Sequence, residues 1–297
     1  MGSPRLVIVH RRTEFAELLD RHATVGQAEF FLRTRGRRLQ DVQERHTFIM
    51  AALDQVRAAA PADWRRAEVE RTDLSRFMFT EDDVIAVVGQ DGLVANTAKY
   101  LSGQPVLGID PEPGVNAGIL VRHSPASTAA LLARIAAADP SAVSCQDLAM
   151  VTARLDDGQE LSALNEIFIG HSSHQSARYQ ITTPDGRLES QSSSGLIVST
   201  GTGATGWCAS ITLERGGRTL PKPTDPLLAW FVREAWPSPA TGASLTEGVL
   251  AAGESLRICA ASDQLVIFGD GMESDRLTAS WGQEITLQLG TRALRLL

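Results

Sequence analysis

Residues 83–92 have the sequence Asp83-Val84-Ile85-Ala86-Val87-Val88-Gly89-Gln90-Asp91-Gly92, in which the apolar run 84–88 is bounded by Asp83 and a glycine-rich turn. A continuous apolar run bounded by polar and turn residues is typical of a strand buried on both faces of a parallel sheet. Residues 93–101 are predicted as a helix and residues 105–109 as the next strand. A strand, a glycine turn, a helix and another strand in this order predict an α/β fold for this part of the chain.

The segment before this unit predicts further elements of the same domain. Residues 6–9 are a short apolar run, which we expect to form a buried strand, and residues 13–22 are expected to form a helix. Residues 44–60 carry apolar side chains at helical spacing and are followed by Pro61, so they predict a second helix.

Four arginines crowd together between these two predicted helices, at positions 33, 35, 37 and 38. Two interpretations are open. The cluster can be a solvated basic surface, or it can be a phosphate contact or a gating element over a nucleotide.

The pattern changes at about residue 147 to short strands separated by turns. Predicted strands cover residues 148–155, 163–169, 178–182, 195–199, 265–268, 284–289 and 292–297. Residues 216–244 are rich in Pro and Gly and are predicted as a long loop. We therefore expect an α/β (Rossmann-like) domain over residues 1–122 and an all-β domain over residues 123–297, whose C-terminal segment can pack back on the first domain.

Composition narrows the functional classes. The net charge of −7 argues against non-specific nucleic-acid binding, which usually needs a basic face. The chain has 3 cysteines, which are far apart and predict neither a disulfide framework nor a zinc site, so we expect reduced thiols in a cytoplasmic protein. No apolar run approaches the ~18 residues of a membrane span, and no membrane partner is expected.

The turn Gly89–Gly92 is the first candidate site. Ligands of open α/β sheets bind at the carboxyl ends of the strands, and glycines allow phosphates to approach the backbone. Asp91 could hold Mg²⁺, orient a hydroxyl or accept its proton. The alternative is a simple turn in which Asp91 caps the following helix.

Two adjacent polar residues, Asn165 and Glu166, interrupt an otherwise apolar predicted strand. Because neighbouring strand residues point to opposite faces, at least one of them is expected to face the interior and to need a polar partner. A ligand amide or a ribose diol would serve. The alternative is a polar pair at the edge of a strand.

Two glycine-rich segments are further candidates. Residues 199–207 carry almost only Gly and hydroxyl side chains before Trp207, which suits a polar ligand with a planar ring; the alternative is a plain surface loop. Gly269-Asp270-Gly271 predicts either a hairpin turn or a second carboxylate near the active site.

Taken in order and spacing, these motifs resemble the NAD kinase family, most of all its mitochondrial-type branch. The resemblance rests on residues 89–92, similar to the family's GGDGT, on 108–110 with Gly118, on 164–170, on 194–195, on 200–203 with Trp207, and on 269–271. It implies two domains with the active site in the cleft between them. It also implies transfer of a phosphoryl group from ATP, with Mg²⁺, to the 2′-hydroxyl of the adenosine ribose of NAD, giving NADP, by a homodimer or higher homo-oligomer.

The resemblance also assigns residues. Asp91 matches the catalytic aspartate, beside Gly89 and Gly92, and no resident metal site is expected. Asn165 and Glu166 match the dinucleotide-binding pair of the β-rich domain. The remaining nucleotide-binding positions are Ser199, Thr200, Thr202, Ala204, Trp207, Ser210 and Asp270, of which Thr202, Ala204, Trp207 and Ser210 correspond to the adenine site.

Three departures from the family pattern keep two alternatives open. Gln90 replaces the second glycine, Leu93 replaces the threonine, and Asp110 stands where the family has asparagine. The chain can therefore instead be a small-molecule kinase that acts on a nucleoside or polyol, or a non-catalytic nucleotide-binding homologue.

Overall fold

The computed structural model describes residues 4–114, 118–137, 144–217 and 219–297. It divides the chain into two compact units, Met1–Cys145 together with Arg295–Leu297, and Gln146–Leu294. The division falls at Cys145 rather than at residue 122, because Leu132 of helix α5 (Thr128–Ala136) is packed into the core of the first unit.

The first unit is built on a parallel sheet in the strand order β2 (Arg65–Glu70), β1 (Arg5–His10), β3 (Asp83–Val88) and β4 (Pro105–Ile109). Every residue of β3 is buried, which confirms the strand predicted from its continuous apolar run. The end of β16 (Glu284–Leu296) adds a further parallel strand beside β4, with Leu296 opposite Val106. Strand β2 was not predicted, because its sequence is mostly charged.

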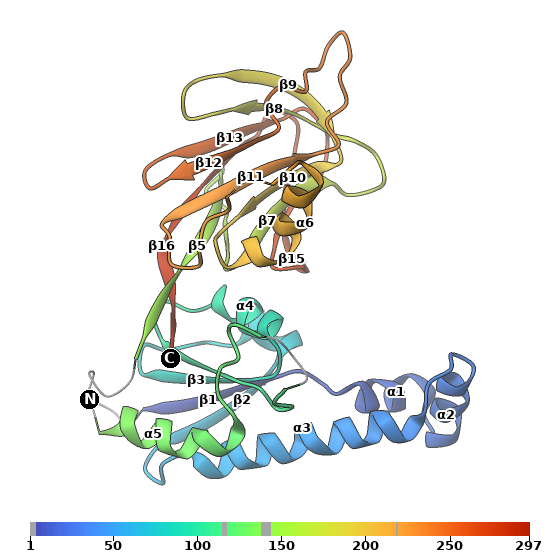
Figure 1. Ribbon diagram of the computed structural model, residues 1–297, viewed down its shortest axis with the longest axis vertical. Coiled ribbons are helices and arrows are strands. Elements are labelled where there is room, and N and C mark those ends of the chain that lie inside the picture. The colour runs from blue at the N-terminus through green and yellow to red at the C-terminus, as the bar shows by residue number, and fades with distance from the viewer. Residues whose placement is uncertain (1–3, 115–117, 138–143, 218) are drawn as a thin grey trace. The chain divides into compact units, whose positions relative to one another are not determined.

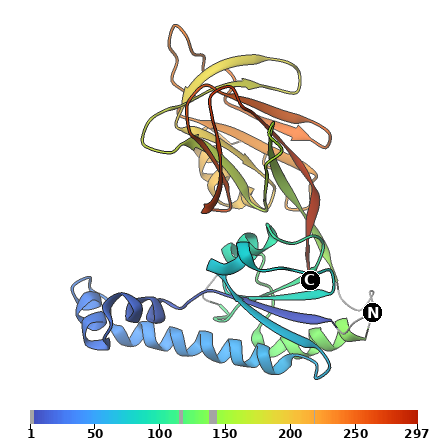
Figure 2. The same ribbon diagram turned by 180° about the vertical axis from the view of Figure 1, so that it is seen from behind.

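Helices connect these strands (Figure 1). They are α1 (Glu14–His22), α2 (Val25–Arg33), α3 (Leu39–Ala59), η1 (Arg71–Arg76), α4 (Asp91–Ala98), η2 (Pro125–Ser127) and α5. Helix α3 packs on the sheet through Ala52, Leu53 and Val56. Its first half joins α1 and α2 around a separate small core of Leu18, Ala28, Leu32 and Val42, at the end of α3 away from α5 (Figure 2).

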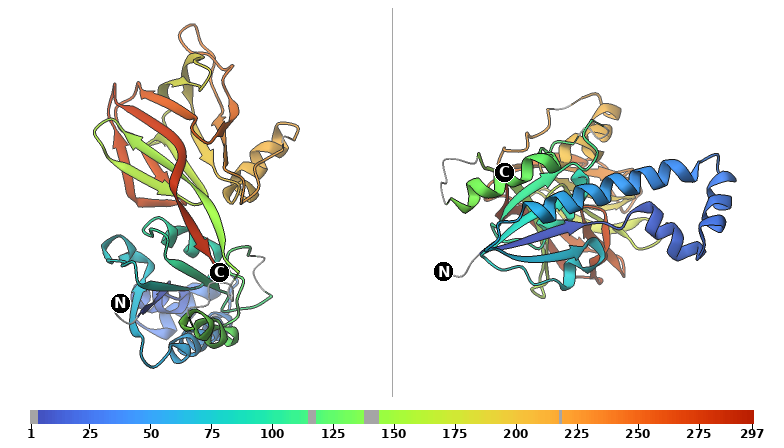
Figure 3. Two further views of the ribbon diagram at one scale, coloured as in Figure 1. Left: turned by 90° about the vertical axis from the view of Figure 1, so that its left-hand side faces the viewer. Right: turned by 90° about the horizontal axis from the view of Figure 1, so that it is seen from below.

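The second unit consists of two sheets. One contains β16, β13 (Ser255–Ala260), β8 (Ala177–Thr182) and β9 (Leu188–Ser193), with β5 (Gln146–Leu155) on β16 and β6 (Glu160–Ala163) on β5. The other has the order β12 (Glu247–Ala251), β11 (Leu227–Arg233), β10 (Gly195–Ser199), β7 (Glu166–His171), β14 (Leu265–Gly269) and β15 (Met272–Ala279). Both sheets can be followed in the left view of Figure 3.

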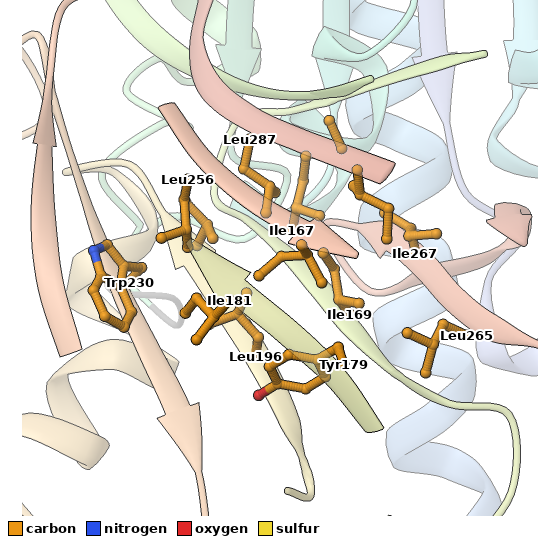
Figure 4. Packing of buried hydrophobic residues seen from close by; sticks show 14 of the residues in the cluster. Ile167, Ile169, Tyr179, Ile181, Leu196, Trp230, Leu256, Leu265, Ile267 and Leu287 are labelled. Carbon is orange, nitrogen blue, oxygen red and sulfur yellow. The ribbon is translucent and has the colours of Figure 1, made fainter. Parts of the chain in front are cut away.

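The core of this unit takes side chains from both sheets (Figure 4). Ile167, Ile169 and Leu196 come from the six-stranded sheet, and Tyr179 and Leu256 come from the other. On its opposite face the six-stranded sheet is covered by α6 (Trp207–Glu214), which follows the short turn η3 (Gly203–Thr205). The first unit is thus mixed α/β and the second is largely β, as predicted.

Several local predictions were wrong. Residues 216–244 are not one long loop, because the apolar run Leu227–Arg233 between Pro- and Gly-rich flanks forms the buried strand β11. Residues 163–169 are two strands with a bend at Leu164 and Asn165 between them. Residues 284–289 and 292–297 belong to the single strand β16.

None of the helices in the described part of the chain combines the length and the apolar character needed to span a bilayer.

Candidate functional site

The candidate residues fall into two groups, one in each unit. Gly89, Asp91 and Gly92 belong to the first unit, at the junction of β3 and α4. The predicted residues from Asn165 to Asp270 belong to the second unit. Each group is a local arrangement with its own geometry.

The Asp91 carboxylate is bound by three backbone amides of one loop. Its Oδ2 accepts from Ile119 N at 2.7 Å, and its Oδ1 accepts from Leu120 N at 2.9 Å and Val121 N at 3.0 Å. Gly118 permits this contact, because a Cβ there would lie 2.6 Å from Asp91 Oδ1. A carboxylate has about four lone-pair positions, so among the described residues about one remains for a ligand hydroxyl.

Asp91 is the first residue of α4 and does not cap it, because Gln90 occupies the N-cap position. Leu93 is 6% exposed and lies against Gly89, where a Cβ would be 2.9 Å from its Cδ2. Leu93 therefore packs over the glycine turn. Gly92 has open space around it, so packing does not require a glycine there.

The turn at Gly269–Gly271 holds the bend that carries Asn165. Asp270 and Gly271 have positive φ values of 53° and 66°, which is the backbone of a two-residue hairpin turn between β14 and β15. The Asp270 carboxylate accepts from Asn165 N at 2.7 Å and from Leu164 N at 2.9 Å. The hairpin turn predicted for this motif is confirmed, and it places a carboxylate beside Asn165.

The loop after β10 holds the same bend from its other side. Thr200 Oγ1 donates to Leu164 O at 2.5 Å, and Thr200 N donates to Asn165 O at 2.9 Å. Ser199 Oγ donates to Asn165 O at 3.2 Å. Gly203 packs directly on the bend, because a Cβ there would lie 2.3 Å from Asn165 O. Residues 199–204 are buried and residues 205–207 are exposed, so only the end of the segment lies at the surface.

The Asn165 side-chain amide and the Glu166 carboxylate take no part in holding the bend. Both residues are half-buried, and no described residue hydrogen-bonds the Asn165 amide or the Glu166 carboxylate. Thr202 Oγ1 is likewise buried without a hydrogen-bond partner among the described residues. The arrangement has the character of a binding site, because its backbone is saturated while these polar groups are left over.

Glu166 is electrostatically perturbed. Burial, with a further contribution from the Asp270 carboxylate, raises the pKa of Glu166 to about 7. It lies opposite Ser199 in the β7–β10 pairing, on the sheet face that α6 covers. Burial, with the nearby Glu166 charge, also raises the pKa of the Cys208 thiol to about 11, so this cysteine stays protonated and unreactive.

Trp207 begins α6 and is 38% exposed. Its ring stacks on Phe168 at a centroid distance of 5.8 Å, and the Arg233 guanidinium lies 5.0 Å from its ring centre. Phe168 is two residues beyond Glu166 on the same sheet face, so the ring lies on the face that carries the carboxylate. Ala204 is buried beside this region, whereas Ser210 is exposed on α6.

Sequence reasoning missed three parts of this arrangement. The loop at residues 119–121 gave no signal because it binds Asp91 through its backbone. Phe168 and Arg233 were not recognised as partners of Trp207, although the alternation of β7 places Phe168 and Glu166 on one face. The described residues contain no group of three or more His, Cys, Asp or Glu side chains that could hold a metal ion.

Comparison with known proteins gives a short similarity. No protein-family model matches the chain. A segment of 50 residues, 16% of this chain, is 50% identical to "NAD kinase 2, mitochondrial" from Rattus norvegicus and covers 12% of that protein. The human protein of the same name shows the same identity over 50 residues and is covered to 11%. The match thus spans about an eighth of the relatives' length, and it links this chain to NAD kinases over that segment.

Proposed function

We propose that this chain is a phosphotransferase of the NAD kinase type, which transfers a phosphoryl group from ATP to the 2′-hydroxyl of the adenosine ribose of NAD and forms NADP. The observation that carries the proposal is the bend at Asn165 and Glu166. Its backbone is fixed by Asp270, Thr200 and Ser199, while its amide and carboxylate have no hydrogen-bond partner among the described residues. The similarity of a 50-residue segment to NAD kinase 2 supports this choice of reaction.

The second unit would bind the dinucleotide. The Glu166 carboxylate can accept both hydroxyls of a ribose diol, and the Asn165 amide can both donate and accept. Trp207 offers a partly exposed ring for a planar base, backed by Phe168. Thr202, Ala204 and Ser210 are assigned to the adenine side of this site by the family resemblance.

The first unit would act on the reacting hydroxyl. Asp91 is held rigidly by three amides, and its remaining acceptor position on Oδ2 can orient the acceptor hydroxyl. The donor would bring Mg²⁺ on its phosphates, where the ion offsets the charge of the transferring group. A metal bound mainly through substrate phosphates needs only one or two protein carboxylates, and Asp91 would supply one only in place of the acceptor hydroxyl, because three amides leave it about one acceptor position.

The test is NADP formation from NAD, ATP and Mg²⁺ by the purified chain. We expect turnover by the wild type and a loss of at least a hundredfold in kcat for Asp91→Asn. Glu166→Gln is expected to raise the KM for NAD with a smaller effect on kcat. Asp185→Asn, at an exposed turn, is the matched control. No turnover by the wild type, or full turnover by Asp91→Asn, would refute this mechanism.

A non-catalytic nucleotide-binding protein is the second candidate. It is favoured by the engagement of Asp91 with three amides and by the packing of Leu93 over Gly89. NAD binding in calorimetry without phosphoryl transfer from ATP, GTP or polyphosphate would support it. A panel of nucleosides and polyols in the same assay tests the third alternative, a kinase with another acceptor.

A further inference from the structure

A cavity of about 390 Å³ in the first unit is lined by three arginines, Arg37, Arg38 and Arg45. Its wall also contains four acidic residues, Glu14, Asp41, Glu44 and Glu112. All of these residues lie within the first unit. The structure therefore divides the arginine cluster seen in the sequence. Arg37 and Arg38 reach the cavity, whereas Arg33 and Arg35 lie over the rings of Phe30 and Phe31.

The cavity lies at the carboxyl edge of the parallel sheet. Glu14 follows the end of β1 and Glu112 follows the end of β4, while β3, which ends in the turn Gly89–Gly92, lies between these two strands. Helix α3 returns the chain from β1 to the parallel strand β2, so its N-terminal half lies at the same edge. Ligands of open α/β sheets bind at this edge.

Each cavity arginine is held by an exchangeable partner. Arg37 pairs with Glu14 at 2.5 Å, Arg38 with Asp41 at 2.6 Å, and Arg45 with Glu112 at 3.1 Å. In each of the three pairs the arginine side chain is about half exposed or more. Arg37 and Arg38 each hold their carboxylate through two nitrogens, so an incoming anion has to replace paired hydrogen bonds there, whereas Arg45 holds Glu112 through one.

A phosphate chain is the anion that fits these groups. Guanidinium groups bind phosphate oxygens through paired, charge-assisted hydrogen bonds. Several adjacent phosphates can engage three arginines at once, whereas Glu14, Asp41 and Glu112 engage one each and Glu44 accepts from Gln40. The first turn of α3 also borders the cavity, and a helix N-terminus favours negative charge.

We propose that this cavity binds the polyphosphate chain of the phosphate donor, with Arg37, Arg38 and Arg45 exchanging their carboxylate partners for phosphate oxygens. The assignment of the bound chain to a donor rests on the proposed phosphotransferase function. The binding of a polyphosphate by the cavity does not depend on turnover.

The test is calorimetric titration of the full chain with inorganic tripolyphosphate at low salt. We expect saturable binding by the wild type and a weakening of at least tenfold for Arg37→Gln/Arg38→Gln/Arg45→Gln. Arg154→Gln removes an exposed, ion-paired arginine in the second unit and is expected to bind like the wild type. Glu112→Gln releases Arg45 from its partner and is expected to bind about threefold more tightly, a gain that a misfolded variant would not give.

The outcomes separate this inference from the proposed function. Absence of saturable tripolyphosphate binding by the wild type, or equal binding by the triple variant, overturns the inference even if NADP is formed. Binding that depends on the three arginines, without any NADP formation, upholds the polyphosphate site and refutes the kinase. In an active enzyme, an unchanged KM for ATP in the triple variant overturns the assignment to the donor.

Discussion

Asp270→Asn tests how the hairpin turn supports the bend at Asn165. The carboxylate accepts hydrogen bonds from Leu164 N and Asn165 N, at 2.9 and 2.7 Å. An asparagine tolerates the positive φ of 53° but offers one acceptor atom, so one amide loses its partner. Losing one charge-assisted bond to a buried amide costs about 2–3 kcal/mol of unfolding free energy.

The loss of unfolding free energy should depend on pH, because the Asp270 carboxylate also repels the Glu166 carboxylate. Burial and Asp270 together raise the pKa of Glu166 to about 7, so Glu166 is neutral at pH 5.5 and charged at pH 8.5. Removing the Asp270 charge lowers the pKa of Glu166. At a pH where Glu166 is ionised, each unit by which its pKa falls raises the unfolding free energy of the variant by ~1.4 kcal/mol. We therefore expect the full loss at pH 5.5 and a loss about 1 kcal/mol smaller at pH 8.5.

Urea unfolding followed by tryptophan fluorescence measures both values. Trp230 is 2% exposed in the core of the second unit, and only Trp64 lies in the first unit. Asp185→Asn, another turn aspartate of the second unit, is the control and should change little. A loss that is the same at both pH values, or smaller than ~0.5 kcal/mol at pH 5.5, would refute this account of the bend.

Three further predictions concern stability. In the wild type, Glu166 keeps its proton in the folded state between pH 4.5 and about 7, so its contribution to stability falls by about 3 kcal/mol as the pH rises through this window. Glu166→Gln should remove this slope in urea titrations. Gly203→Ala should lower the unfolding free energy by about 2 kcal/mol, because the added Cβ would lie 2.3 Å from Asn165 O; a change in the melting temperature within error would contradict it. Asp83→Asn should cost about 3 kcal/mol, because Asp83 is 1% exposed and binds Arg5 through two nitrogens; unchanged thermal unfolding of the first unit would show that the pair is dispensable.

Elements with a strong local signal could be predicted from the sequence. The apolar run of β3 indicates a buried strand, and the glycines of Gly89–Gly92 indicate the turn that ends it. Both signals lie within ten residues. The strands β5, β8 and β10 also have boundaries close to the predicted ones. In each case the deciding interactions are those of the segment itself.

The remaining features depend on partners distant in the sequence. The apolar Leu164 extends the strand pattern, but Asp270, 106 residues later, takes its amide and bends the chain. The arginine cluster divides because Glu14 and Phe31 attract different members of it. For the same reason, the local sequence could not predict that Asp91 accepts hydrogen bonds from residues 119–121.

The return of Arg295–Leu297 to the first unit has a consequence for biosynthesis. Strand β4 acquires its neighbour Leu296 only after all of residues 146–294 have been translated, which takes on the order of 10–30 s at typical ribosome speeds. Until then one edge of a parallel sheet presents unpaired backbone groups to other nascent chains. Pairing of this edge of β4 is therefore a late step in the folding of the first unit, and chaperones that shield strand edges should bind preferentially to chains stalled before residue 295.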